Sequence, residues 1–145
     1  MESEHSFPTL RSVVLDTTDA RALAEFYRKL PGYVYRPGDE PPAGGAPDER
    51  GHDWLVIHHP SGMPRMAFQQ VKTLPRSSWP ENEPVPQQLH LDTSVQTFAE
   101  LERQRMRALD LGATLLLDRS HDEQEPLYVF GDPSGHPFCI FVAPQ

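Results

Sequence analysis

Several side chains in the second half of the sequence could take part in catalysis or bind a metal ion. His90, Asp92 and Ser94 alternate along the segment 89–95, LHLDTSV, and side chains two apart on a strand point to the same face. A histidine side chain titrates near neutrality, so His90 is a candidate general base. Because side chains two apart on a strand are roughly 6 to 7 Å apart, we expect His90 and Asp92 to contact one ligand together without a direct bond between them.

Asp16 and Cys139 extend the set of candidate catalytic residues. Asp16 and Asp92 stand at matching places in two Leu-Asp-Thr triplets, so a buried pair of carboxyl groups would supply an acid and a base. Strand-end aspartates that bond turn amides are the alternative. Cys139 would be a nucleophile only beside a base or a cation, and its apolar sequence neighbours favour an inert core thiol. For His90 the alternative is a hydrogen-bonded histidine without a catalytic role.

Other chemistries lack their sequence signals. His58 and His59 are adjacent, so on a regular strand they point to opposite faces and cannot chelate one ion together. The sequence contains no Walker A loop, no Gly-X-Gly-X-X-Gly motif after a strand and no Gly-X-Ser-X-Gly elbow. These absences argue against nucleotide-driven chemistry and serine hydrolysis.

Composition indicates a cytoplasmic protein. The net charge of −8 and the pI near 5.3 argue against nucleic acid or an anionic membrane as a partner, since both require basic patches. The single cysteine excludes an intramolecular disulfide framework, and the segment MESEHSFPTL lacks the features of a signal peptide. Eleven Arg against two Lys suggest a GC-rich bacterial genome.

The elements that must position these residues occur twice along the chain, as strand, helix, strand, strand, strand. The first half predicts strands at 10–16, 33–36, 53–58 and 65–71, with a helix at 20–30 capped by Asp19. The second half predicts strands at 89–95, 113–117, 127–130 and 137–142, with a helix at 98–112 capped by Thr97. Loops rich in proline fill 37–51 and 72–88.

Both halves close with a Pro-Ser-Gly-X-Pro turn between apolar runs, HPSGMPRMAFQQV at 59–71 and DPSGHPFCIFV at 132–142. This repetition predicts one domain over residues 1–145, with module one at about 8–72, a linker at 73–87 and module two at about 88–145. A half of about 70 residues would be marginal alone, so the two halves should share a core.

The ensemble resembles the vicinal oxygen chelate (VOC) superfamily, which groups glyoxalases, bleomycin resistance proteins and extradiol dioxygenases, and within it the glyoxalase-like branch. The segments that carry the resemblance are LDTTDARALAEFYRKLPG, QLHLDTSV and VFGDPSGHPFCIF, in that order. The resemblance covers nearly the whole chain. It implies an α+β fold in which two tandem βαβββ modules form curved mixed sheets around a cavity, and it implies a homodimer.

The resemblance also places metal ligands near the start of the first strand and on the last strand of each module. The first-strand positions fall on Ser12 and His90, and the last-strand positions, counted from the turns, fall on Met66 and Cys139. Only His90 and a Cys139 thiolate are good donors, and two protein ligands fall short of the three that catalytic zinc normally has. We therefore expect an incomplete metal site and no cofactor, with a divalent metal as the open alternative.

The same alternation predicts which other residues line the cavity, because same-face neighbours of these four positions would join them. The candidate ligand-binding residues are Ser12, Val14, Phe68, Gln70, Ser94 and Phe141, together with Trp79 of the linker. Trp79 is expected to be either a lid over the cavity or a dimer contact. His136, in the second turn, is expected to be exposed.

The leading functional prediction is a glyoxalase-like protein that binds or sequesters a small organic ligand, because the usual metal-ligand set is incomplete. The alternative is a lyase, isomerase or dioxygenase-type enzyme that uses His90 with or without a divalent metal. A dimerisation or regulatory module without a ligand is the third possibility. The sequence leaves open the identity of the ligand, and whether the modules pair within one chain or between two.

Overall fold

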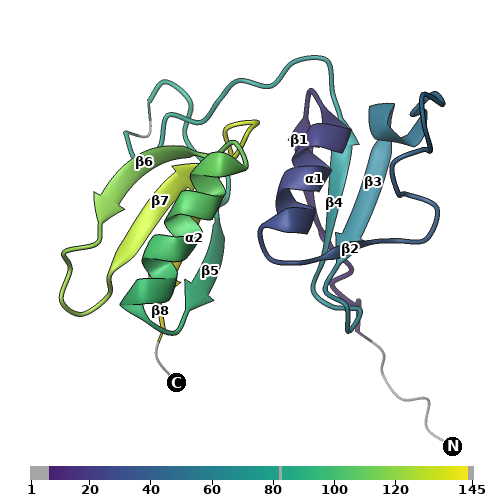
Figure 1. Cartoon of the computed structure of the whole chain (residues 1–145). Helices are drawn as coiled ribbons and strands as arrows, with labels where there is room; N and C mark the ends of the chain where they lie inside the picture. The colour runs from purple at the N-terminus through teal and green to yellow at the C-terminus, as the bar shows by residue number, and fades with distance from the viewer. Residues whose placement is uncertain (1–6, 82, 144–145) are drawn as a thin grey trace, which may run out of the picture.

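A computed structural model describes residues 7–81 and 83–143 and arranges them as two βαβββ halves joined by a long linker (Figure 1). The first half contains β1 (Val13–Thr17), α1 (Ala20–Lys29), β2 (Val34–Tyr35), the short 3-10 helix Arg50–His52, β3 (Trp54–His58) and β4 (Arg65–Gln70). The second half contains β5 (Leu91–Val95), α2 (Phe98–Asp110), β6 (Thr114–Arg119), β7 (Leu127–Gly131) and β8 (Pro137–Val142). The predicted order of elements is confirmed. Among the described residues, no helix has the length and apolar character needed to span a membrane.

Each half folds its four strands into one mixed sheet. The strand orders are β1-β4-β3-β2 and β5-β8-β7-β6. The first and last strands of each half run parallel, whereas the other neighbours are antiparallel. The predicted α+β class with two mixed sheets is therefore confirmed, and the two sheets stay separate instead of closing into a barrel.

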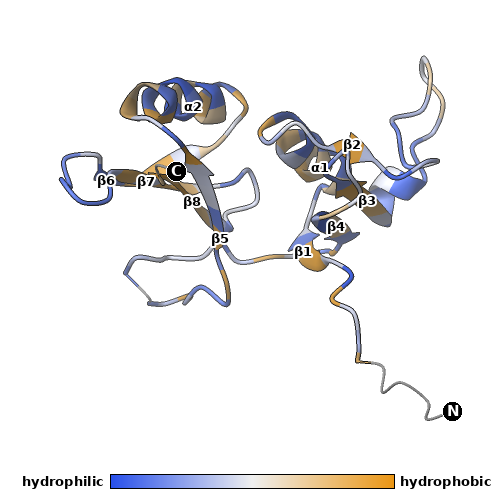
Figure 2. Ribbon diagram, turned by 90° about the horizontal axis from the view of Figure 1, so that it is seen from below, coloured by the Kyte–Doolittle hydropathy of each residue, from blue (hydrophilic) through white to orange (hydrophobic). Residues whose placement is uncertain are grey.

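Both helices begin where the capping signals predict. The Asp19 side chain accepts a hydrogen bond from the Ala22 amide, and the Thr97 side chain accepts one from the Glu100 amide. These bonds satisfy amides that have no partner within the helix. The two helices lie on the same side of the two sheets, so no helix covers the opposite faces (Figure 2).

One apolar core joins the two halves. Phe26 of α1 packs edge-on against Phe138 of β8, with ring centroids 5.7 Å apart. Phe138 in turn stacks on Phe130 of β7 at 5.2 Å, and all three rings are buried. Because α1 and β8 belong to different halves, the shared core expected from the small size of each half is present.

The two Pro-Ser-Gly turns differ by one residue despite their shared letters. In the first turn the His59 amide donates to the Pro64 carbonyl, whereas in the second the Asp132 amide donates to the His136 carbonyl. The first loop therefore holds one more residue than the second. Counting along the chain from the turns consequently misplaces β4 by one position relative to β8.

This difference corrects the predicted face of β4. In the parallel pairing of the first and last strands, the counterpart of Cys139 is Ala67 and not Met66. Met66 and Phe68 are buried in the core under α1, and the Gln70 side chain bonds the first amide of that helix at 2.8 Å. A one-residue shift in a strand moves every side chain to the other face. The prediction that Phe68 and Gln70 line the cavity is therefore wrong.

Candidate functional site

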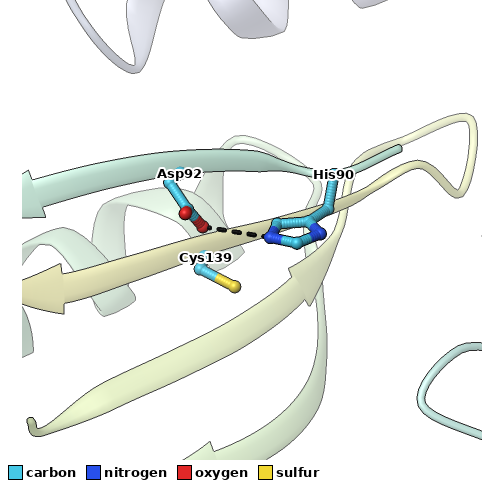
Figure 3. Close-up of side chains that lie close together, drawn as sticks. All are labelled: His90, Asp92 and Cys139. Atoms are coloured by element: carbon cyan, nitrogen blue, oxygen red, sulfur yellow. Dashed lines mark ion pairs between the residues drawn. The ribbon is translucent and has the colours of Figure 1, made fainter.

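His90, Asp92 and Cys139 come together on one face of the second sheet (Figure 3). One nitrogen, oxygen or sulfur atom of each residue lies within 4.8 Å of those of the other two. His90 Nε2 is 3.3 Å from Asp92 Oδ1, so the predicted separation, too large for a direct contact, is wrong. The side chains lean toward each other and close the gap between their backbone positions (Figure 3).

Strand alternation explains why these three side chains meet. Asp92 of β5 is directly opposite Cys139 of the parallel strand β8, and His90 immediately precedes β5. The neighbours of Cys139, Phe138 and Ile140, point into the core under the helices. Because successive side chains on a strand alternate, Cys139 must lie on the opposite face, where Asp92 and His90 also lie.

The cluster is open to solvent at its imidazole and carboxylate. The side chains of His90 and Asp92 are 38% and 59% exposed, whereas Cys139 is buried. Burial and, after it, the nearby Asp92 carboxylate raise the pKa of Cys139 to about 11. Without a metal the thiol is therefore protonated at neutral pH, and Cys139 has the environment of an unreactive thiol and not of an activated nucleophile.

Trp79 of the linker covers the histidine of this cluster. Its ring is nearly parallel to the His90 ring, with an interplanar angle of 13° and centroids 6.0 Å apart. Trp79 is half-buried. Trp79 is not among the residues that line the cavity described below, so its predicted role as a lid over the cavity or a dimer contact stays a prediction.

The donor set of the cluster fits a borderline metal ion. Imidazole nitrogen, carboxylate oxygen and thiolate sulfur are the three kinds of ligand found around zinc, and three protein ligands with an open position are typical of catalytic zinc. The sequence-based count of two donors, His90 and Cys139, omitted Asp92, which does not lie at a position named by the family resemblance. The described residues hold no other such group of three or more His, Cys, Asp or Glu donors.

The remaining predicted site residues fall in different places. Ser94 is exposed and Phe141 is half-buried, on the cluster's face of the second sheet. Ser12 is half-buried and immediately precedes β1 of the first sheet. Asp16 and Asp92 are both exposed and lie on different sheets, so the predicted buried pair of carboxyl groups is wrong.

A cavity of about 390 Å³ lies between β1, the linker and the turn from β7 to β8. Val14 and Asp16, two of the predicted site residues, line it. The rest of its wall comes from residues that sequence reasoning did not select, including Leu74, Val85, Gln87, Leu89 and His136. Only the unusual proline content of the linker pointed to an ordered segment there.

Asp132 was also missed, and His136 is not exposed as predicted. Asp132 is fully buried and accepts hydrogen bonds from Tyr27 Oη at 2.7 Å and from His136 Nδ1 at 2.8 Å. The His136 side chain is only 17% exposed. The Asp-X-X-X-His spacing in the turn was the one sequence signal of this pair.

Solved structures share the fold at low sequence identity. A glyoxalase/bleomycin resistance protein/dioxygenase family enzyme from Burkholderia phytofirmans PsJN is 17% identical, with a TM-score of 0.65 over 91% of this chain and 96% of that chain. A glyoxalase/dioxygenase from Nostoc punctiforme is 18% identical, with a TM-score of 0.63 over 100% of this chain and 97% of that chain. A variant of the fosfomycin resistance protein FosX from Listeria monocytogenes, complexed with Mn(II) and 1S,2S-dihydroxypropylphosphonic acid, is 13% identical, with a TM-score of 0.66 over 95% of this chain and 94% of that chain.

Sequence comparison identifies the family directly. No curated protein is significantly similar to this chain. Residues 12–141 match the family model described as Glyoxalase-like domain. This match spans most of the sequence, and it agrees with the two mixed sheets and with the structural relatives. The chain therefore belongs to the glyoxalase-like domain family of the VOC superfamily.

Proposed function

We propose that the protein is a metal-dependent enzyme of the lyase or isomerase class that acts on a small organic molecule at the His90, Asp92 and Cys139 cluster. The observation that carries the proposal is the convergence of three different donor atoms within 4.8 Å of one another. The exposure of His90 and Asp92 supports it, because a substrate can reach the cluster from solvent.

Zinc is the metal that this donor set favours. Manganese is bound mainly by oxygen ligands, whereas a thiolate selects softer ions. The FosX relative with Mn(II) supports a metal-dependent function, although a thiolate donor points to a different ion here. Zinc has no redox chemistry, so the proposal favours lyase or isomerase chemistry over dioxygenase chemistry.

The side chains at the cluster have two proposed roles, to bind the metal ion and to shield the site from water. A bound zinc ion would polarise an oxygen atom of the substrate as a Lewis acid. His90, Asp92 and Cys139 would hold the ion, and the 3.3 Å contact between His90 Nε2 and Asp92 Oδ1 places two of these donors side by side. The Trp79 ring, stacked on His90, shields one side of the imidazole from water.

Metal analysis by mass spectrometry tests the proposal directly. The protein is purified without a histidine tag, and the metal-free form is then titrated with zinc, manganese, nickel and iron(II). We expect close to one equivalent of zinc, with binding weakened by about 10- to 100-fold or more in His90→Ala and Cys139→Ser. His121→Ala, which removes an exposed histidine outside the cluster, is the matched control. Absence of binding by all four metals, or equal losses in His121→Ala, would overturn the proposal.

A second candidate function, metal-free binding of an organic ligand, is favoured by the state of Cys139. With its pKa raised to about 11, the thiol must lose a proton before it can bind a metal, and this opposes metal uptake. If the titrations show no metal while an organic ligand binds stoichiometrically, this second function replaces the first.

We further propose that the two halves, with module one at about 8–72 and module two at about 88–145, work as one domain. The packing of Phe26 on Phe138 supports this, since it crosses between the halves. The homodimer implied by the family resemblance stays a prediction, which light scattering coupled to gel filtration will test. The cytoplasmic location also stays a prediction.

A further inference from the structure

The cavity between β1, the linker and the second turn is separate from the metal-ligand cluster. None of the three cluster residues lines it, although Leu89, at its wall, is the residue immediately before His90. We propose that this cavity is a second binding site, which takes a basic organic molecule, an amine carried on an aromatic or other apolar body. The proposal does not depend on whether the cluster binds a metal.

A buried carboxylate orients the histidine in the cavity wall. His136 Nδ1 contacts Asp132 Oδ2 at 2.8 Å, and the Asp132 side chain is completely inaccessible to solvent. Asp132 also accepts from Tyr27 Oη at 2.7 Å and from the Ser134 amide at 2.8 Å, so its carboxylate is held from several sides. A carboxylate bonded to Nδ1 fixes the proton on that nitrogen. The ring of His136 is thereby held in one orientation in the cavity wall.

The charged side chains of the wall are of one sign. Asp16 is the one carboxylate that lines the cavity, and among the described residues no Lys or Arg lines it. A site with a carboxylate and without Lys or Arg in its described wall favours a protonated amine and disfavours an anion.

The rest of the wall suits an apolar body. Its apolar side chains include Val14, Leu74, Val85 and Leu89, and the volume of about 390 Å³ lies within the range typical of small-molecule pockets. A bicyclic aromatic ring with a short side chain matches this volume. The net charge of −8 further favours the approach of a cation.

Tryptamine is a suitable probe because it carries an ammonium group on an indole ring. Indole-3-acetate, which carries a carboxylate on the same ring system, is the matched control. Both are titrated into ¹⁵N-labelled protein and followed by ¹H–¹⁵N correlation NMR. We expect tryptamine to shift the amides of Asp16, Leu89 and His136, and to bind at least about tenfold more tightly than indole-3-acetate, because only the ammonium group forms a charge-assisted bond to Asp16.

Three variants in the cavity and one control outside it make the test specific. Asp16→Asn should weaken tryptamine binding by about tenfold, whereas Asp110→Asn, which removes an exposed carboxylate outside the cavity, should not. His136→Leu should also weaken it, and melting curves will show whether that variant folds. Val85→Trp fills the cavity without touching the Asp132 network and should abolish binding.

Several results would overturn the proposal. The first is equal affinity for the two probes, and the second is tryptamine binding that neither Asp16→Asn nor Val85→Trp changes. The third is no binding of tryptamine at about 5 mM, a concentration at which even a weak complex with a millimolar Kd is detected. The zinc titration of the same samples reports on the cluster separately, so failure at one site is distinguished from failure at the other.

Discussion

Tyr27 and Asp132, 105 residues apart in the sequence, are joined by a 2.7 Å hydrogen bond from the phenol Oη to the carboxylate Oδ2. Tyr27 lies on α1 of the first half, and Asp132 lies in the last turn of the second half. Both side chains are buried. Burial raises the pKa of Tyr27 well above its ordinary value, and the Asp132 carboxylate adds to this, so the phenol keeps its proton and donates. The bond therefore links the two halves.

Tyr27→Phe should lower the free energy of unfolding by about 1 to 3 kcal/mol, because it leaves a buried carboxylate short of one donor while it preserves the aromatic ring. Urea unfolding at pH 7 measures the change. Tyr33→Phe is the control, since the Tyr33 hydroxyl has no hydrogen bond to any other described residue and the side chain is half-buried. Equal losses in the two variants would contradict a linking role for the Tyr27 bond.

The repeated architecture was predictable from local signals. The caps at Asp19 and Thr97 and the alternating strands depend on a few neighbouring residues, and the structure has them where the sequence places them. The face of β4 was not predictable in this way. It depends on whether the first turn closes at Pro64 or one residue earlier, and the two turns share the same Pro-Ser-Gly-X-Pro letters.

The candidate site was predictable only in part, for a similar reason. His90 and Cys139 follow from the family resemblance, but the contact of Asp92 with His90 depends on how two side chains lean within one face. Strand spacing fixes the backbone positions but does not determine these side-chain conformations. The stacking of Trp79 on His90 and the linker part of the cavity wall depend on the path of a proline-rich segment that has no periodic pattern. Strand alternation therefore predicted Val14 and Asp16 but not the linker residues of the wall.

Cys139 should react slowly with iodoacetamide in metal-free protein. With a pKa of about 11, only about one thiol in a thousand is ionised at pH 8, and the side chain is buried as well. The nearby Asp92 carboxylate contributes to the raised pKa, so Asp92→Asn should accelerate alkylation at pH 8. Mass spectrometry of timed samples gives the rates. Asp110→Asn, which removes an exposed carboxylate on α2, should leave the rate unchanged. An unchanged rate in Asp92→Asn as well would refute the electrostatic explanation.

Gly62 and Gly135 occupy corresponding places in the two turns. Replacing each by alanine therefore compares the cost of backbone strain with and without a steric clash. Both have a positive φ, +106° and +95° respectively, which residues with a side chain rarely adopt. A Cβ at Gly62 would meet nothing within 4 Å, whereas one at Gly135 would lie 3.0 Å from Cβ and Cγ of Arg76. Gly62→Ala should therefore cost about 1 to 2 kcal/mol from strain alone, and Gly135→Ala should cost more.

Thermal melts and urea unfolding of both glycine variants test this difference. Because Cβ and Cγ of Arg76 belong to the part of the side chain near the backbone, they cannot swing aside as a guanidinium group can. Replacement of Arg76 by alanine in the Gly135→Ala background should recover part of the extra loss. A smaller loss of unfolding free energy in Gly135→Ala than in Gly62→Ala would show that Arg76 of the linker does not pack closely against this turn.

The pairing of Arg21 with Asp48 should make stability depend on pH in the acid range. Arg21 Nε and Nη2 each donate a hydrogen bond to one carboxylate oxygen of Asp48 at 2.8 Å. This bidentate interaction is stronger than a single hydrogen bond. The hydrogen bond from Arg21 lowers the pKa of Asp48 below its ordinary value. Since the pKa is lower in the folded than in the unfolded protein, the pair stabilises the fold fully above the unfolded pKa, about 4, and loses this contribution as the pH falls through the folded pKa.

Asp48→Asn should therefore lower the free energy of unfolding by about 1 kcal/mol at pH 7 and by much less at pH 2.5, where the wild-type carboxyl group is also protonated. Urea unfolding at both pH values measures the two differences. Glu49→Gln removes the same charge from the neighbouring exposed residue, which makes no side-chain cap bond, and should change stability little at either pH. If Asp48→Asn cost the same free energy at pH 2.5 as at pH 7, the loss would come from packing and not from the ionised pair.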